Sequence, residues 1–256
     1  MKKGQMVCLC LKNKGSAVRF CLWPPMNQNL NYGRTLLLEK FDNFCSKQNF
    51  PKTISIAIVG GSKDEPEIEI IKKYTNIENT TVFGIDAQSD EYFDLNRRNK
   101  NKEYTNFDFI LCSQVIEHIW NMSEFYLNLK NLCDVKTILY ISCPKSNMEH
   151  GSPDYFSSGY SVKFLEKNLE EINFKILDSG EVGSEVYYKS IHLLQDWLTE
   201  EEVSNRYKFK SKSLKFKLKH FSKLFNIGSY LVLKRNNNRK TSNFMTEAFV
   251  FAILDN

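Results

Sequence analysis

The sequence predicts an α/β fold with a doubly wound, mostly parallel sheet. Short apolar runs typical of strands alternate along the chain with segments of helical periodicity. The run 54–59 is apolar at nearly every position, as expected for a parallel strand that is covered on both faces. Gly60 and Gly61 follow this run, and Pro66 suits the first position of a helix after them. These features predict a strand, turn and helix unit at the start of the sheet.

The other elements follow from the same patterns. A helix is expected over 33–46, with the apolar positions Leu36, Leu37, Phe41 and Phe44 at helical spacing. Further strands are expected at 81–86, 91–96, 107–113, 137–143 and 174–178. Ser123 and Ser161 each precede an apolar helical stripe, so they are the predicted N-caps of two helices. A final strand, 244–254, is predicted to be an antiparallel edge.

Composition excludes several classes of protein. The chain has 256 residues, of which 42% are hydrophobic and 25% charged, so it can bury a core and is not disordered. It has no apolar run of about 20 residues that could span a membrane and no clear export signal, so a cytoplasmic protein is expected. The cysteines and histidines are scattered without metal-ligand spacing. Reduced thiols and no metal site are therefore predicted.

Polar residues and glycines gather where the predicted strands end. Ligands of open parallel sheets bind beyond these carboxyl ends, so the turn 60–62, Asp86 and residues 113–118 are expected to converge. Asp86 follows Gly60 by 26 positions and can accept both hydroxyls of a ribose. A nucleoside cofactor is therefore expected.

The charges after the first strand narrow the choice of nucleoside. The acids there are Asp64, Glu65, Glu67 and Glu69, and they would repel a pyrophosphate. S-adenosylmethionine has no phosphate and carries a sulfonium and an ammonium group, so an acidic rim suits it. The alternative is that these acids only complement a helix dipole.

Several motifs resemble class I S-adenosylmethionine-dependent methyltransferases, especially the group related to quinone-biosynthesis enzymes. The resemblance covers residues 52–183. It rests on I-A-I-V-G-G-S, F-G-I-D-A, F-D-F-I-L-C-S-Q-V-I-E-H-I and I-S-C-P. The stretch H-G-S-P-D-Y-F-S-S-G-Y-S-V-K-F-L is similar to methyltransferases of surface-polysaccharide gene clusters, including those of the capsular O-methyl phosphoramidate route. Ser62 and Asp64 stand where the family usually has glycines, and the interval 86–107 is too short for a full helix and a strand.

The resemblance implies a Rossmann-like methyltransferase fold and S-adenosylmethionine as cofactor, with S-adenosylhomocysteine as product. It implies methyl transfer to oxygen of a small sugar-containing or phosphorylated metabolite in surface-polysaccharide modification. The expected cofactor contacts are Gly60, Gly61, Ser62, Asp86, Ala87, Asp94, Leu95, Ser113, Gln114 and His118. The expected acceptor contacts are Asp154, Tyr155 and Tyr160.

Two histidines are candidates for the base that takes the proton of an acceptor hydroxyl, because imidazole titrates near neutral pH. His150 lies in the loop after the predicted strand 137–143, and His118 follows the strand 107–113. Each has a plainer interpretation: His150 as an exposed loop residue, and His118 as a structural or cofactor-side contact.

The chain divides into a cap segment (1–50), a cofactor-binding core (51–183), a basic insertion (184–243) and a last strand (244–256). Arg206–Lys240 contains 12 Lys or Arg and no acid, although the whole chain is only +5, so the remainder is net acidic. Such a segment can meet a nucleic acid, an anionic membrane face or a phosphorylated substrate, or be a solvated insertion. An RNA or DNA methyltransferase and a non-catalytic partner with this fold therefore remain as alternatives.

Overall fold

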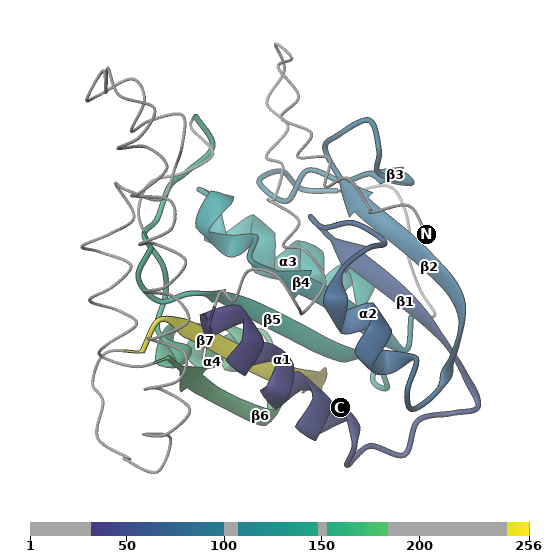
Figure 1. The fold of residues 1–256 in the computed structure, drawn as a ribbon. Helices are drawn as coiled ribbons and strands as arrows, with labels where there is room; N and C mark the ends of the chain where they lie inside the picture. The colour runs from purple at the N-terminus through teal and green to yellow at the C-terminus, as the bar shows by residue number, and fades with distance from the viewer. Residues whose placement is uncertain (1–31, 100–106, 148–152, 184–244, 256) are drawn as a thin grey trace, which may run out of the picture.

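A computed structural model describes residues 32–99, 107–147, 153–183 and 245–255, and it shows one seven-stranded sheet between two layers of helices (Figure 1). The strands are β1 (Thr53–Val59), β2 (Asn76–Gly84), β3 (Glu91–Tyr92), β4 (Phe109–Ser113), β5 (Ile138–Pro144), β6 (Phe174–Val182) and β7 (Glu247–Leu254). The helices of the described residues are α1 (Tyr32–Cys45), α2 (Pro66–Ile71), α3 (Met122–Leu132) and α4 (Val162–Glu171), together with the 3₁₀ turn η1 (Ile116–His118).

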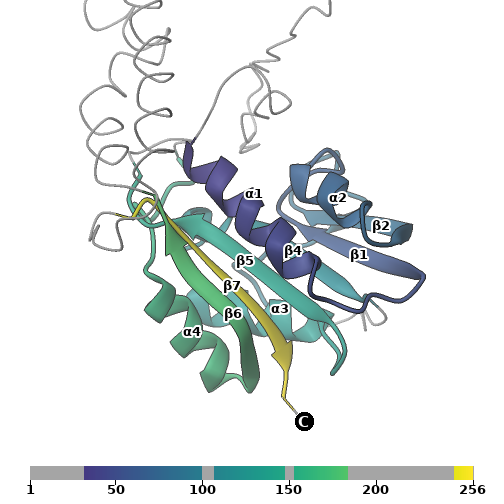
Figure 2. The same ribbon diagram turned by 60° about the horizontal axis from the view of Figure 1, so that its bottom comes forward.

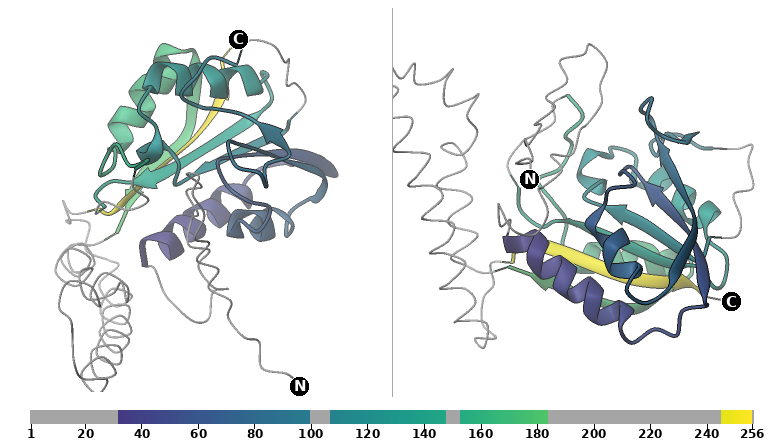
Figure 3. Two further views of the ribbon diagram at one scale, coloured as in Figure 1. Left: turned by 90° about the horizontal axis from the view of Figure 1, so that it is seen from above. Right: turned by 45° about the vertical axis from the view of Figure 1, so that its right-hand side comes forward.

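The helices cover the sheet on both faces. α1 and α2 lie on one face, where their apolar side chains form a core with residues such as Ile56, Leu111 and Phe251. α3 and α4 lie on the other face, over Ala57, Ile110 and Val250 (Figure 2). Seen from above, the sheet separates the two layers (Figure 3). This arrangement confirms the predicted doubly wound α/β fold.

The strand order is β3-β2-β1-β4-β5-β7-β6, and β7 is the antiparallel strand. The prediction that the last strand is antiparallel is confirmed, but its place at an edge was wrong. β7 pairs with β5 through Tyr140 and Phe251, and with β6 through Ser179 and Val250. Its residues from Ala248 to Ala252 are buried on both faces, as in a central strand.

Several strand boundaries differ from the prediction, and β6 for example runs to Val182 instead of residue 178. β2 starts at Asn76 and ends at Gly84, so Asp86 lies in the turn after it. β3 contains only two residues, because Asp94 accepts a hydrogen bond from the amide of Asn96 (2.9 Å) and begins a turn. β7 begins at Glu247 instead of residue 244, and residues 184–244, including the basic segment, lie outside the described residues.

The helix starts follow local capping chemistry. The predicted cap Ser161 is confirmed, because its Oγ accepts the amide hydrogen of Phe164 (3.3 Å). The predicted cap Ser123 was wrong: Asn121 caps α3 by accepting from the amide of Glu124 (3.4 Å), and Ser123 lies within the first turn. α2 begins at Pro66 as predicted. Among the described residues, no helix combines the length and the apolar character needed to cross a bilayer.

Candidate functional site

The carboxyl ends of the parallel strands meet at one edge of the sheet. The strand order reverses between β1 and β4, which makes this pair the switch point where open α/β sheets bind ligands. Because β7 is antiparallel, its first residue, Glu247, lies at the same edge and pairs with Pro144 at the end of β5. Side chains from β1, β4, β5 and β7 can therefore build one site.

The glycine turn after β1 is closely packed. Gly60 has a φ of +73°, and a Cβ atom there would lie 2.8 Å from Cγ1 of Val115. A side chain at this position would be strained in both respects. Ser62, which stands at a glycine position of the resembling family, supports the turn by accepting from the amide of Asp64 (3.3 Å). The turn follows β1 at the carboxyl-end edge of the sheet, where the sequence predicted it.

A buried guanidinium group beside this turn was not predicted. Arg34 of α1 donates to Glu65 Oε2 (3.1 Å), to Glu67 Oε2 (2.7 Å) and to Ser113 Oγ. Ser113 donates to Glu67 Oε1 (3.1 Å), and its hydroxyl also bonds that of Ser142 on β5 (2.8 Å). Burial and the charge of Glu67 raise the pKa of Glu65 to about 7, although Arg34 opposes the shift. These contacts tie α1 to α2 and to the end of β4.

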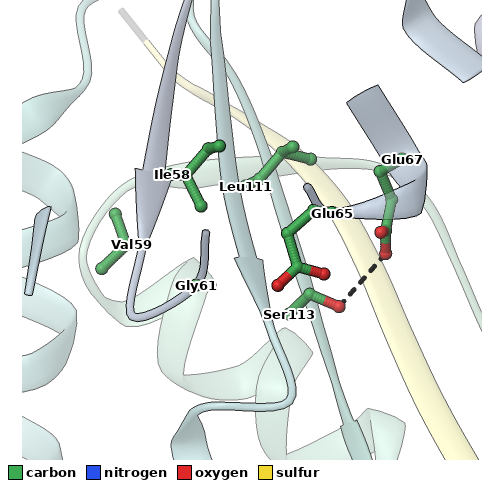
Figure 4. Close-up of a pocket in the computed structure, with 7 residues that line it drawn as sticks. All are labelled: Ile58, Val59, Gly61, Glu65, Glu67, Leu111 and Ser113. Atoms are coloured by element: carbon green, nitrogen blue, oxygen red, sulfur yellow. Dashed lines mark hydrogen bonds between the residues drawn. The ribbon is translucent and has the colours of Figure 1, made fainter. Parts of the chain in front are cut away.

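A small recess lies within this group of residues (Figure 4). It is lined by Ile58, Val59, Gly61, Glu65, Glu67, Leu111 and Ser113. Its empty space is about 190 Å³ with open solvent included, and its enclosed part is too narrow for a water molecule. The surrounding side chains therefore close the recess in this structure, and a ligand here would lie against its rim.

Two more buried carboxyl groups lie at the same edge. Glu117 of η1 is 1% exposed, and its Oε2 has no hydrogen-bond partner among the described residues. Glu247 is 7% exposed and accepts from Gln114 Nε2 (3.3 Å). Burial raises the pKa of both groups to about 8, and the charge of Glu117 adds to the shift of Glu247. The described part of this edge thus carries more carboxyl groups than cations.

The predicted acceptor side is partly brought together. His118 Nδ1 lies 2.5 Å from the carbonyl oxygen of Asp154, and its ring centroid lies 6.0 Å from that of Tyr155. A carbonyl oxygen only accepts, so Nδ1 carries a hydrogen and Nε2 is the basic atom of the neutral ring. This Nε2 lies 3.9 Å from Glu117 Oε1 in a buried setting. Tyr160 does not join this group; its ring stacks on that of Phe164 of α4, with 4.6 Å between the ring centroids.

The residues predicted to meet the adenosine lie in different environments. Asp86 and Ala87 are exposed in the turn after β2, where Asp86 Oδ1 accepts from the amide of Gln88 (2.9 Å). Asp94 pairs with Arg97 (3.2 Å). Leu95 is 6% exposed and packs in the core under α3, so it is not free to face a ligand as the prediction required. The predicted base His150 lies outside the described residues.

A neighbouring ion pair holds the two loops of this edge together. Lys63 of the glycine turn pairs with Asp90 (2.9 Å), which also accepts from the amide of Val82 (2.9 Å). That backbone hydrogen bond, with the Lys63 contact, lowers the pKa of Asp90. In the part of the chain that the structure describes, no group of three or more His, Cys, Asp or Glu side chains could hold a metal ion.

Comparisons with known proteins agree with this architecture. No family model and no curated protein matches the sequence. Among solved structures, a protein from Galdieria sulphuraria assigned as a sarcosine dimethylglycine methyltransferase has a TM-score of 0.50 and 8% identity, over 87% of this chain and 88% of that one. An O-methyltransferase of a Brevibacillus brevis polyketide synthase, in complex with S-adenosylhomocysteine, has 14% sequence identity over 87% of this chain and 75% of that one, with a TM-score of 0.45. The [4+2]-cyclase SpnF has 12% sequence identity over 85% of this chain and 80% of that one, with a TM-score of 0.47.

The Galdieria structure supports the same overall fold along most of both chains. At 8% identity this likeness concerns the fold. The chain therefore has the Rossmann-like α/β fold seen in methyltransferases, as the sequence predicted.

Proposed function

We propose that this protein is an S-adenosylmethionine-dependent methyltransferase with a small-molecule acceptor. The observation that carries the proposal is the acid-edged recess at the switch point, where Arg34 and Glu65 lie side by side. A neighbouring guanidinium and carboxylate complement the two charges of an α-amino acid, which is one end of this cofactor. A dinucleotide would instead bring phosphates against Glu65 and Glu67.

The residues of the edge suit the parts of this cofactor. Arg34 would hold its carboxylate, and Glu65 its ammonium group. The tight turn at Gly60 and Gly61 follows β1 at this edge, and the exposed carboxylate of Asp86 would accept the ribose hydroxyls. The recess is too small for the adenosine, which would extend along the edge toward Asp86.

When bound, the cofactor supplies a methyl group on a positively charged sulfur. The protein's part is to hold the acceptor at about 3 Å from that carbon, to exclude water and to receive a proton. His118 contributes by position: its Nδ1–H bonds Asp154, and the backbone of Glu117 accepts from the amide of Phe156 (3.0 Å). Together they fix the loop after β5 against η1.

For the acceptor we propose a sugar-containing metabolite methylated on oxygen in the cytoplasm, during surface-polysaccharide modification. The resemblance of the region around Asp154 and Tyr155 supports this. The described charges favour a neutral hydroxyl over a phosphoryl group, because the described part of this edge carries more carboxyl groups than cations and its Lys145 already pairs with Glu181. The nucleic-acid alternative depends on residues 206–240, which lie outside the described residues.

Calorimetric titration of the full chain with S-adenosylhomocysteine tests the cofactor. We expect saturable binding, no binding of NAD, and a loss of about tenfold or more in affinity for Asp86→Ala, because a charged hydrogen-bond acceptor is removed. Glu78→Ala is the control, since Glu78 is an exposed carboxylate at the other end of β2. If NAD binds in place of S-adenosylhomocysteine, or neither binds, the proposal is wrong.

Transfer of a labelled methyl group to sugars and sugar phosphates tests the acceptor class. Retention of mixed RNA on filters at low salt, lost at higher salt, would favour the nucleic-acid alternative. Cofactor binding without any methylated product across a broad panel would favour the non-catalytic alternative.

A further inference from the structure

Glu247 is a buried carboxyl group that the cofactor roles above do not use. It shares a side of β7 with Phe249 and Phe251, whose rings pack toward α1. It lies at the carboxyl-end edge because β7 is antiparallel, and it pairs with Pro144 of β5 and Val182 of β6. Glu247 is therefore on the β5 side of the switch point, opposite the β2 side where Asp86 lies.

The surroundings of Glu247 leave its charge largely uncompensated. One hydrogen bond, from Gln114 Nε2 (3.3 Å), reaches its Oε2. No lysine or arginine of the described residues lies within ion-pair distance of it; Arg34 of α1 acts on it only from further away. The other titratable groups that face it are Glu117 of η1 and Tyr140 and Cys143 of β5.

The backbone of α1 approaches this carboxylate closely. A Cβ atom on Gly33 would lie 2.8 Å from Glu247 Oε1, so the glycine leaves space for the carboxylate at the first turn of the helix. Glu247 is thereby held between Gln114, which follows β4, and the start of α1. A side chain held in this way is pre-positioned for a reaction at the edge.

The protonation of Glu247 also suits proton transfer. Burial and the nearby charge of Glu117 raise its pKa to about 8, so a basic and an acidic form are both accessible near neutral pH. His118, in contrast, directs its basic Nε2 toward Glu117. A base is required near the acceptor, and Glu247, unlike Glu117, has no described histidine within ion-pair distance and lies beside Pro144, where β5 leads into the loop of Asp154 and Tyr155.

We propose that Glu247 is the catalytic base that receives the proton of the acceptor hydroxyl; this rests on the methyltransferase function proposed above. The hydroxyl oxygen forms a bond to the methyl carbon as the carbon–sulfur bond breaks, and the electron pair of that bond stays on sulfur. The hydroxyl proton passes to the carboxylate of Glu247, and it is released to solvent after the methylated product leaves.

A pair of cofactor analogues tests this placement without knowledge of the acceptor. In sinefungin, a carbon that bears an amine replaces the methylated sulfur, whereas S-adenosylhomocysteine has no group at that place. If Glu247 faces the transferred methyl group, it pairs with the amine of sinefungin. Glu247→Gln is then expected to weaken sinefungin binding by about tenfold or more, and to change S-adenosylhomocysteine binding less than about twofold.

Three further measurements fix the interpretation. Glu39→Gln is the matched control, because Glu39 is exposed on α1, and thermal melts verify that each variant is folded. Equal effects of Glu247→Gln on both analogues, or no effect on either, overturn the assignment, as does a selective loss in Glu117→Gln instead. If the wild-type protein binds neither analogue, the proposed function itself is wrong, which is a different outcome.

Discussion

Two pairs of carboxyl groups lie at the same edge of the sheet, and they differ in what compensates them. Glu65 and Glu67 share the guanidinium of Arg34. Glu117 and Glu247 are equally buried, but neither pairs with a described lysine or arginine. The first pair therefore shares a cation that joins two helices, whereas the second has no such cation and is stabilised by taking up protons.

This difference separates two uses of a buried acid. A compensated carboxylate joins elements, as Glu67 does when Arg34 and Ser113 both donate to it. An uncompensated one exchanges protons near neutral pH, because burial raises its pKa. The pattern of partners thus distinguishes the groups that hold the site from those available for proton transfer.

Removal of Arg34 should have the largest effect on stability, because it leaves the first pair of carboxyl groups without a cation, as the second pair already is. Arg34→Met leaves Glu65 and Glu67 buried without their cation, and we expect a loss of about 3 to 5 kcal/mol in the free energy of unfolding. Urea denaturation at neutral pH measures it. Lys40→Met is the control, because Lys40 is exposed on the same helix. A loss no larger than that of the control would show that the pair is not the tie between α1 and α2.

The second pair of carboxyl groups should make the free energy of unfolding depend on pH. Glu117 and Glu247 have folded-state pKa values of about 8 against an ordinary value of 4.5. Their protonated forms therefore favour the folded state, a contribution that is complete below about 4.5 and is lost as the pH rises through about 8. We expect wild-type stability to fall by about 1 to 3 kcal/mol between neutral and mildly alkaline pH.

Glutamine at both positions provides the comparison for this pH effect. The double variant Glu117→Gln/Glu247→Gln should show a flatter dependence of the unfolding free energy on pH, because the amides do not titrate. Glu65, whose pKa is about 7, remains in both proteins and adds the same background. Parallel curves for the two proteins would contradict the uncompensated state of this pair.

The sequence predicted most of the sheet because its signals are local. The run 54–59, the glycine turn at Gly60 and the cap Ser161 each depend on neighbouring residues, and all three were confirmed. The cap of α3 was wrong because Asn121 and Ser123 are both good capping residues two positions apart, and only the backbone angles decide between them. The central place of β7 had a signal that was overlooked, because its residues are apolar on both faces.

The site was less predictable, because its contacts join distant parts of the chain. Arg34 contacts Ser113, which is 79 positions away, and Gln114 contacts Glu247 across 133 positions. Helical spacing places Arg34 on the same face of α1 as Leu37 and Phe41, unlike the exposed Lys40, but it does not show which groups Arg34 meets. The strand-end rule pointed to the edge where Arg34 and these carboxyl groups gather, but only the packing of α1 and β7 on the sheet shows which charges meet there.

The smallest expected effect concerns an exposed ion pair, and it tests whether burial makes an ion pair stabilising. Lys73, which follows α2, pairs with Asp42 of α1 (3.3 Å), so a second ion pair joins the same two helices, but its side chains are 53% and 38% exposed. Lys73→Met should cost about 0.5 kcal/mol or less, because solvent screens an exposed pair, and the cost should vanish at about 1 M salt. Urea unfolding at two salt concentrations measures this, with Arg34→Met alongside. If Lys73→Met costs as much as Arg34→Met, burial is not what makes the Arg34 pair strong, and the contrast between the two carboxyl pairs would need another cause.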